Sequence, residues 1–255
     1  MYRFLLLLVC STACFMPNEE NDMLIIAHRG FSSKAPENTL AAFEKAIEQG
    51  ADYFECDVRK SLDDKIVVIH DELLERTTNG KGLVKSKSLH ELKLLSAGYA
   101  KKFGSQFASE RIPTLKETLE LAKKQIKVEI EIKAKGLASE VVKLVRTLNM
   151  ENEVIIISFN YEEVKKAKEL APEIETMYLV GALWGKEELN QTKLIGAEYI
   201  GPSGIPSKRK IEMAHKMGIK VVSYTINDEQ TIKKAIKHGV DGIATDFLDK
   251  AMSLK

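Results

Sequence analysis

Short runs of aliphatic and β-branched residues alternate along this chain with amphipathic stretches of helical period, and this alternation constrains the fold more than any other feature. Nine runs have the length and composition of strands, at residues 24–27, 53–58, 66–69, 127–132, 154–158, 174–179, 198–200, 220–224 and 242–244. Helical patterns lie between most of them, at residues 39–49, 115–124, 137–148, 161–170, 208–216 and 229–237. Such alternation is typical of a parallel sheet covered by helices.

The connection between the second and third runs is too short for a parallel crossover. Only residues 59–65 separate these runs, whereas a crossover between parallel strands needs about a dozen residues or more. The run at 66–69 is therefore expected to return antiparallel, which leaves eight parallel strands. We predict an α/β fold, a TIM-type (β/α)8 barrel formed by residues 23–255 as a single domain, with an insertion at about 72–111 after the second strand and its return. The alternative is a doubly wound open sheet.

The first 22 residues differ from the rest of the chain. Arg3 is the only charged residue before a polar spacer at 18–22, and the segment between is apolar or small. This pattern predicts a secretory leader that is too short to cross a bilayer as a helix. Small residues before Cys14 favour a lipoprotein leader, so we expect an exported protein, periplasmic or at the cell surface, attached to the membrane through lipidated Cys14. Simple cleavage or retention of the leader is the alternative.

The composition argues against nucleic-acid binding and excludes an intramolecular disulfide in the body of the chain. Lys and Arg number 38 against 37 Asp and Glu, without long basic blocks, which argues against a nucleic-acid binder that works by counterion release. After the leader only Cys56 remains, so an intramolecular disulfide within the body is excluded. We expect Cys56 to be a buried small hydrophobe.

Ionisable residues collect where the predicted strands end. In barrels of this type, active sites are built at the carboxyl ends of the strands. The first strand, the second strand, its return and the strand at 127–132 supply seven such residues to one rim: His28, Arg29, Glu55, Asp57, His70, Glu131 and Lys133.

The carboxylates of this rim predict a metal site. Side chains of a strand alternate between its faces, so Glu55 and Asp57 share one face, and Glu129 and Glu131 share another. Carboxylates that converge in a partly dehydrated space repel one another unless a cation compensates them. All-oxygen ligation by Glu55, Asp57 and Glu131 suits one hard divalent cation, Mg²⁺ or Ca²⁺. The alternative is that these carboxylates form structural ion pairs. For Glu129, which could pair with Lys127, this alternative is as reasonable as a role at the metal site.

Two histidines and an arginine complete the chemistry expected at the rim. His28 and His70 can exchange protons near neutral pH and form a candidate acid and base pair. Arg29 presents a fork that suits phosphate oxygens. Together with a cation, these groups indicate phosphoryl transfer.

At this point the chain resembles the glycerophosphodiester phosphodiesterase family, over essentially all of residues 24–246. The matching segments, in family order, are His28-Arg29-Gly30, Pro36-Glu37-Asn38-Thr39, Glu55-x-Asp57-Val58, His70-Asp71, Thr77-Thr78-Asn79-Gly80, Arg111-Ile112-Pro113-Thr114-Leu115, Glu131-Ile132-Lys133, Ser158-Phe159, Tyr224-Thr225-Ile226-Asn227 and Thr245-Asp246. The resemblance implies a metal-dependent barrel enzyme that hydrolyses small-molecule glycerophosphodiesters, such as glycerophosphocholine and glycerophosphoethanolamine, to glycerol 3-phosphate and an alcohol.

The resemblance also implies roles for individual residues. They are His28 and His70 as acid and base, Glu55, Asp57 and Glu131 as metal ligands, and Arg29, Lys133 and Tyr224 as substrate contacts. Tyr224 stands where the family usually has Trp, which preserves an aromatic wall, and Glu129 stands where Asn is more common. A proline that usually follows two residues after Asp246 is missing.

Some positions stay open between two interpretations. Glu37 falls at a predicted helix start. There its carboxylate either interacts favourably with the helix dipole or supports the residues of the predicted active site. Trp184 either lines the substrate mouth or caps the barrel. The insertion, with aromatic residues at 99, 103 and 107, is either a cover over the site or an inert excursion.

Two further functions compete with the leading one. The same fold and metal would serve a lysophospholipase D-type enzyme acting on lysophospholipids, to which a membrane-anchored form has ready access. A catalytically silent surface protein that binds phosphodiester head groups is the other alternative, and the presence of both His28 and His70 counts against it.

Overall fold

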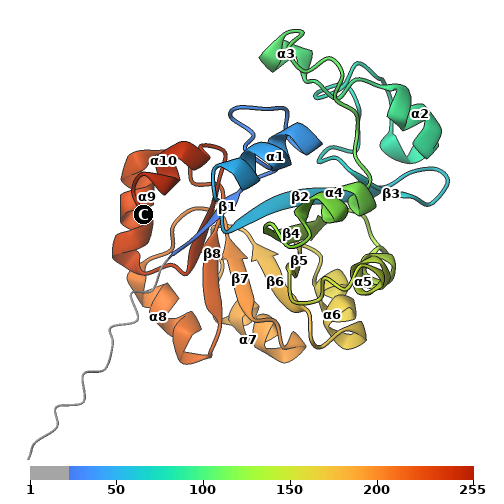
Figure 1. Ribbon diagram of the computed structural model, residues 1–255. Helices are drawn as coiled ribbons and strands as arrows, with labels where there is room; N and C mark the ends of the chain where they lie inside the picture. The colour runs from blue at the N-terminus through green and yellow to red at the C-terminus, as the bar shows by residue number, and fades with distance from the viewer. Residues whose placement is uncertain (1–22) are drawn as a thin grey trace, which may run out of the picture.

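Eight parallel strands close into a barrel in the computed structural model, which describes residues 23–255 (Figure 1). The strands are β1 (Leu24–Ala27), β2 (Tyr53–Lys60), β4 (Lys127–Ile132), β5 (Val154–Ser158), β6 (Glu175–Val180), β7 (Tyr199–Pro202), β8 (Lys220–Ser223) and β9 (Gly242–Thr245). β1 pairs in parallel with both β2 and β9, so the sheet has no open edge between them. The short strand β3 (Ile66–Val68) pairs antiparallel with β2. The predicted barrel and the antiparallel return are confirmed, and the doubly wound open sheet is wrong.

Helices follow the strands and cover the outside of the barrel. They are α1 (Leu40–Glu48), α4 (Leu115–Ala122), α5 (Ala138–Thr147), α6 (Tyr161–Leu170), α7 (Lys186–Ile195), α8 (Lys208–Lys216), α9 (Glu229–His238) and α10 (Leu248–Met252). Local sequence sets their ends: the side chains of Thr39 and Asp228 accept hydrogen bonds from the first turns of α1 and α9. α7 ends at Gly196, whose φ of 74° lies in the left-handed region that favours glycine.

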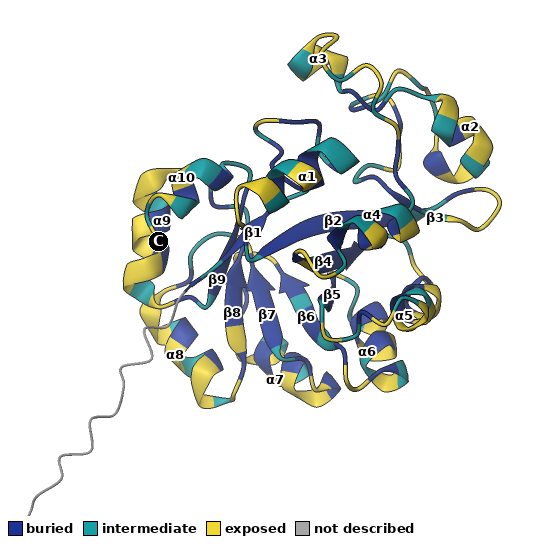
Figure 2. Cartoon of the chain, in the orientation of Figure 1, coloured by how far each residue is buried: buried dark blue, intermediate teal, exposed yellow. Residues whose placement is uncertain are grey.

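The alternation of side chains along the strands produces two separate apolar layers. Residues such as Phe54, Cys56 and Ile130 face the helices, whereas Ile155 and Met177 fill the barrel interior. Figure 2 shows that most strand residues are buried, whereas the outer faces of the helices, many loops and much of the insertion carry the exposed residues. Cys56 is fully buried, as expected for a small hydrophobe.

The register between β2 and β4 decides which acidic residues meet. Glu55 pairs with Glu129, and Asp57 pairs with Glu131. Both pairs point into the barrel, because Cys56 and Ile130, which alternate with them, belong to the outer layer. Four carboxyl groups therefore stand on neighbouring strands inside the barrel.

The insertion between β3 and α4 has a small core of its own. It contains the 3-10 helix η1 (Val84–Ser86) and the helices α2 (Leu89–Leu94) and α3 (Ala100–Phe103). Buried residues of the insertion, such as Leu74, Val84 and Leu92, pack together in this core. The helices α2 and α3 project away from the barrel (Figure 1).

The predicted leader, Cys14 included, lies outside the described residues. Within residues 23–255, every helix is too short or too polar to span a membrane.

Candidate active site

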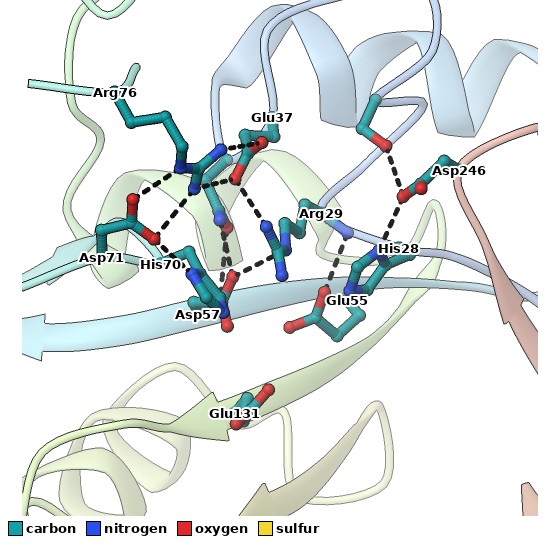
Figure 3. Close-up of polar contacts among 12 residues, drawn as sticks. His28, Arg29, Glu37, Glu55, Asp57, His70, Asp71, Arg76, Glu131 and Asp246 are labelled. Carbon is teal, nitrogen blue, oxygen red and sulfur yellow. Dashed lines mark hydrogen bonds and ion pairs between the residues drawn. The ribbon is translucent and has the colours of Figure 1, made fainter. Parts of the chain in front are cut away.

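Three acidic side chains converge at the carboxyl ends of β2 and β4. Glu55, Asp57 and Glu131 each place one carboxylate oxygen within 4.8 Å of the other two, and all three residues are buried (Figure 3). The sequence predicted this trio, and the β2–β4 register brings it together. The trio could hold a metal ion.

The electrostatics of the trio are those of an acidic cluster that nearby cations compensate only in part. Burial, followed by the charges of Asp57 and Glu131, raises the pKa of Glu55 well above its usual range. Burial and Asp57 raise the pKa of Glu131 to about 7. Burial acts in the same direction on Asp57, but Arg29 and further cations hold the pKa of Asp57 below its ordinary value.

Two oxygens of the trio have no hydrogen-bond partner among the described residues. Glu55 Oε1 and Asp57 Oδ1 are both buried and accept no hydrogen bond, although Lys133 Nζ lies 3.7 Å from Asp57 Oδ1. A buried carboxylate oxygen without a partner is costly, and a bound cation would satisfy both atoms at once. The residues present therefore fit a hard divalent cation with oxygen ligands.

His28 is fixed at the end of β1 by a carboxylate. Its Nδ1 lies 2.7 Å from Asp246 Oδ1, and Asp246 also accepts from Ser32 Oγ and Asn227 Nδ2. These contacts, against the opposing effect of burial, lower the pKa of Asp246, so it is ionised and His28 Nδ1 donates to it. This leaves His28 Nε2 as the atom available to a ligand, in a cavity that Glu55 and Glu131 also line.

His70 is fixed in the same way from the other side of the trio. Its Nδ1 lies 2.6 Å from Asp71 Oδ1. Arg76 holds Asp71 with two hydrogen bonds, from Nε and Nη2, and donates two more to Glu37 (Figure 3). These contacts lower the pKa of Asp71, whereas burial is the largest effect on His70 and lowers its pKa. His70 Nε2 lies 3.3 Å from Lys133 Nζ.

Arg29 lies between the trio and Glu37. Its main-chain N–H donates to Glu55 Oε2 at 2.8 Å, and its Nη1 donates to Glu37 Oε1 at 2.8 Å. Its Nε lies 3.4 Å from Asp57 Oδ2. The following Gly30 is required sterically, because a Cβ there would approach the backbone of Ala42 to 2.7 Å. Arg29 thus orients two carboxylates of the trio, and its predicted contact with phosphate stays a prediction.

Lys133 and Tyr224 reach the site from β4 and β8. Lys133 Nζ donates to Glu131 Oε1 at 2.8 Å and lies 3.7 Å from Asp57 Oδ1. The Tyr224 hydroxyl donates to the carbonyl of Val180, and its ring packs edge-to-face with Phe159 at 5.7 Å. Tyr224 also lines the cavity at the trio, as the expected aromatic wall would.

The structure decides between the interpretations that three positions left open. Glu37 precedes the N-cap residue of α1, whose first turn holds no acidic residue, and forms ion pairs with Arg29 and Arg76, so it supports the site. Glu129 forms no ion pair with a described residue; burial, with Glu131, raises its pKa to about 8, so it is mainly uncharged at neutral pH. Trp184 is 3% exposed, packs in the outer apolar layer and does not line the cavity at the trio.

The sequence analysis also missed supporting residues of the site. Asn38 holds Asp57 through two hydrogen bonds, and Arg76 joins the insertion to His70, so the insertion is not inert. The adjacency of His70 and Asp71 was a signal for their contact. The contacts of Asp246 with His28 and of Arg76 with Glu37 gave no such signal, because each joins distant segments.

Comparison with known proteins agrees with this geometry. Residues 28–250 match the model of the glycerophosphoryl diester phosphodiesterase family. A glycerophosphodiester phosphodiesterase of Caldanaerobacter subterraneus subsp. tengcongensis is 42% identical over 242 residues, covering 91% of this chain and 97% of the relative.

Solved structures extend the similarity to the fold. A phosphodiesterase of Oleispira antarctica, in complex with the product sn-glycerol-3-phosphate, is 33% identical with a TM-score of 0.82, over 90% of this chain and 95% of that one. A glycerophosphodiester phosphodiesterase of Agrobacterium tumefaciens is also 33% identical, with a TM-score of 0.79 over 91% and 99% of the two chains. This chain belongs to the glycerophosphoryl diester phosphodiesterase family.

Proposed function

We propose that this protein hydrolyses glycerophosphodiesters, such as glycerophosphocholine and glycerophosphoethanolamine, to glycerol 3-phosphate and an alcohol, with one bound Mg²⁺ or Ca²⁺. The observation that carries the proposal is the convergence of Glu55, Asp57 and Glu131 within 4.8 Å, with a carboxylate-fixed histidine on either side. The related phosphodiesterase that holds sn-glycerol-3-phosphate supports the choice of product.

Each group of side chains would have a separate role in the reaction. The carboxylates of the trio would hold the cation, which supplies positive charge to the phosphodiester oxygens. Arg29 and Lys133 would add further positive charge beside the same oxygens. One of His28 and His70 would take a proton from the attacking water as its oxygen bonds to phosphorus, and the other would protonate the departing alkoxide as its bond to phosphorus breaks. Asp246 and Asp71 fix the two rings through Nδ1, so Nε2 of each ring would be the atom that transfers the proton, and Nε2 of His70 lies 3.3 Å from Lys133 Nζ.

The test of the proposal is turnover of glycerophosphocholine by the purified protein, with the phosphorus products identified by ³¹P NMR. We expect glycerol 3-phosphate and choline in the presence of Mg²⁺ or Ca²⁺. Chelation with EDTA should abolish turnover, because the trio then lacks its cation, and added divalent ion should restore it. An absence of turnover with every divalent ion tested would contradict the proposal and favour a head-group-binding protein.

A parallel assay with lysophosphatidylcholine separates the competing enzyme function. Turnover of the lysophospholipid alone, with release of a cyclic phosphate or lysophosphatidic acid, would replace glycerophosphodiesters by lysophospholipids as the substrate class. Turnover of glycerophosphocholine at the higher kcat/KM supports the proposal as stated.

Arg76 is a positioning residue whose substitution should slow the reaction. It holds Asp71, which in turn holds His70 Nδ1. We expect Arg76→Gln to lower kcat by about tenfold, with a smaller effect on KM, because the ring of His70 loses its fixed orientation. Arg76→Lys, which keeps the charge but loses the fork, should recover only part of the rate. A kcat within about twofold of the unsubstituted protein would contradict this role.

A further inference from the structure

A groove of about 500 Å³ opens directly beside Lys133. Its walls come from the end of β2, the 3-10 helix η1 of the insertion and the loop that follows β4. The charged residues that line it are five cations and one anion: Arg59, Lys60, Lys85, Lys133, Lys135 and Glu72. The volume lies within the range of sites that enclose small ligands.

Much of this positive charge is not neutralised by the protein. Lys60 is paired with Asp64 and Glu140, and Arg59 lies 3.5 Å from Glu72. Lys85 and Lys135 form no ion pair with any residue of the described part of the chain, and both are exposed. They stand on opposite walls, Lys85 in η1 and Lys135 in the loop after β4.

The groove adjoins the candidate active site through two of its lining residues. Lys133 lines the groove, and its Nζ lies 2.8 Å from Glu131 Oε1 and 3.3 Å from His70 Nε2. Arg59 also lines the groove, and its Nε donates to the main-chain carbonyl of His70 at 2.7 Å. Lys133 therefore stands between a phosphodiester held at the acidic trio and the remaining cations of the groove.

The second cavity at the trio has a different character. It is lined by apolar side chains such as Met177 and Leu179 together with His28 and Tyr224, and no Lys or Arg contributes to its lining. An additional anionic group on the substrate would find compensating charge only on the groove side.

We propose that the groove binds a second phosphate, carried on the alcohol portion of the substrate, and that the enzyme favours glycerophosphodiesters whose head group is itself phosphorylated. This inference rests on the proposed function, because it assumes that a phosphodiester is held at the trio. Lys85 and Lys135 are the residues that select the second phosphate.

The test compares two substrates that differ by one phosphate, glycerophosphoinositol and glycerophosphoinositol 4-phosphate. We expect kcat/KM to be about tenfold higher for the phosphorylated compound at low ionic strength, the equivalent of two exposed charge pairs. In the double variant K85Q/K135Q the ratio of the two values should fall to nearly 1. The ratio cancels any effect that the substitutions have on both substrates equally. Salt at about 0.5 M should reduce the ratio in the unsubstituted protein.

The control variant is K143Q, which removes one positive charge from α5, at a separate surface cavity. It should keep the tenfold ratio, since Lys143 lies outside the groove. A ratio near 1 in the unsubstituted protein, or an unchanged ratio in the double variant, would overturn the proposal while leaving the proposed function intact. If neither compound is turned over, calorimetric Kd values test the groove alone, and equal values for both compounds overturn it; the proposed function fails only if glycerophosphocholine is not turned over either.

Discussion

Replacing His70 with alanine should lower kcat for glycerophosphocholine by about 10² to 10⁴, the usual cost of removing a general acid or base. The structure gives a reason to expect this loss without a loss of metal affinity. His70 contributes no atom to the acidic trio; its Nδ1 is engaged by Asp71, and its Nε2 faces Lys133. The measurement pairs steady-state kinetics with a titration of activity against the divalent ion. The midpoint of that titration should move by less than about threefold.

A second histidine offers a matched control for this experiment. His215 lies 2.8 Å from Asp241, which repeats the histidine-carboxylate contact of His70 and Asp71. Asp241 directly precedes β9, so this pair lies at the amino end of the strands, away from the site. His215→Ala should therefore leave kcat unchanged. Residual activity of His70→Ala within about tenfold of the unsubstituted protein would remove His70 from the proton transfers.

The acidic trio was predictable because it depends only on rules that a sequence carries. The two-residue alternation of a strand assigned Glu55 and Asp57 to one face, and the strand-end rule of the barrel placed them at the mouth. Glu131 followed from the same two rules applied to the next parallel strand. The remaining requirement was the register, and the pairing of Asp57 with Glu131 supplied it.

The long-range contacts that support the histidines were beyond such rules. Asp246, which fixes His28, is 218 positions away, and Arg76, which holds Asp71 beside His70, also bonds to Glu37, 39 positions away. The alternation of side chains along a strand shows which face a side chain occupies, but it does not show which loop residue forms a hydrogen bond with it. The sequence also left open whether Glu129 is charged, because its pKa depends on complete burial beside Glu131.

Replacing Glu55 with glutamine should change stability and activity in opposite directions. In the metal-free protein the Glu55 carboxyl group is buried beside Asp57 and Glu131, and burial is the largest cause of its raised pKa, so above the unfolded-state pKa folding must either bury its charge or bind a proton. Glutamine keeps an oxygen for the main-chain N–H of Arg29 and removes this cost. We expect the metal-free variant to be more stable by about 1–2 kcal/mol at neutral pH, or a few degrees in Tm. Turnover should be lost, because the cation loses a charged ligand.

The pH dependence gives this prediction a definite sign. A carboxyl group with a raised pKa binds protons more tightly in the native state, so it lowers stability as pH rises above the unfolded-state value near 4.5. The gain of Glu55→Gln in the metal-free protein should therefore be small at pH 4.5 and larger at pH 8. A saturating divalent ion should reverse the order: it raises the Tm of the unsubstituted protein, by the equivalent of about 2.7 kcal/mol at a hundredfold excess over Kd, but not that of the variant.

A neighbouring glutamate separates this effect from burial alone. Glu129 is also buried, yet it stands outside the trio and its pKa of about 8 leaves it mainly uncharged at neutral pH. By the same linkage, Glu129→Gln should also stabilise the metal-free protein as pH rises from about 4.5 to about 8, but it should keep the Tm increase caused by the ion, because Glu129 is not a member of the trio. If Glu55→Gln instead destabilised the metal-free protein, or retained the full increase in Tm with Mg²⁺ or Ca²⁺, then Glu55 would not be a ligand and the trio would be a structural cluster.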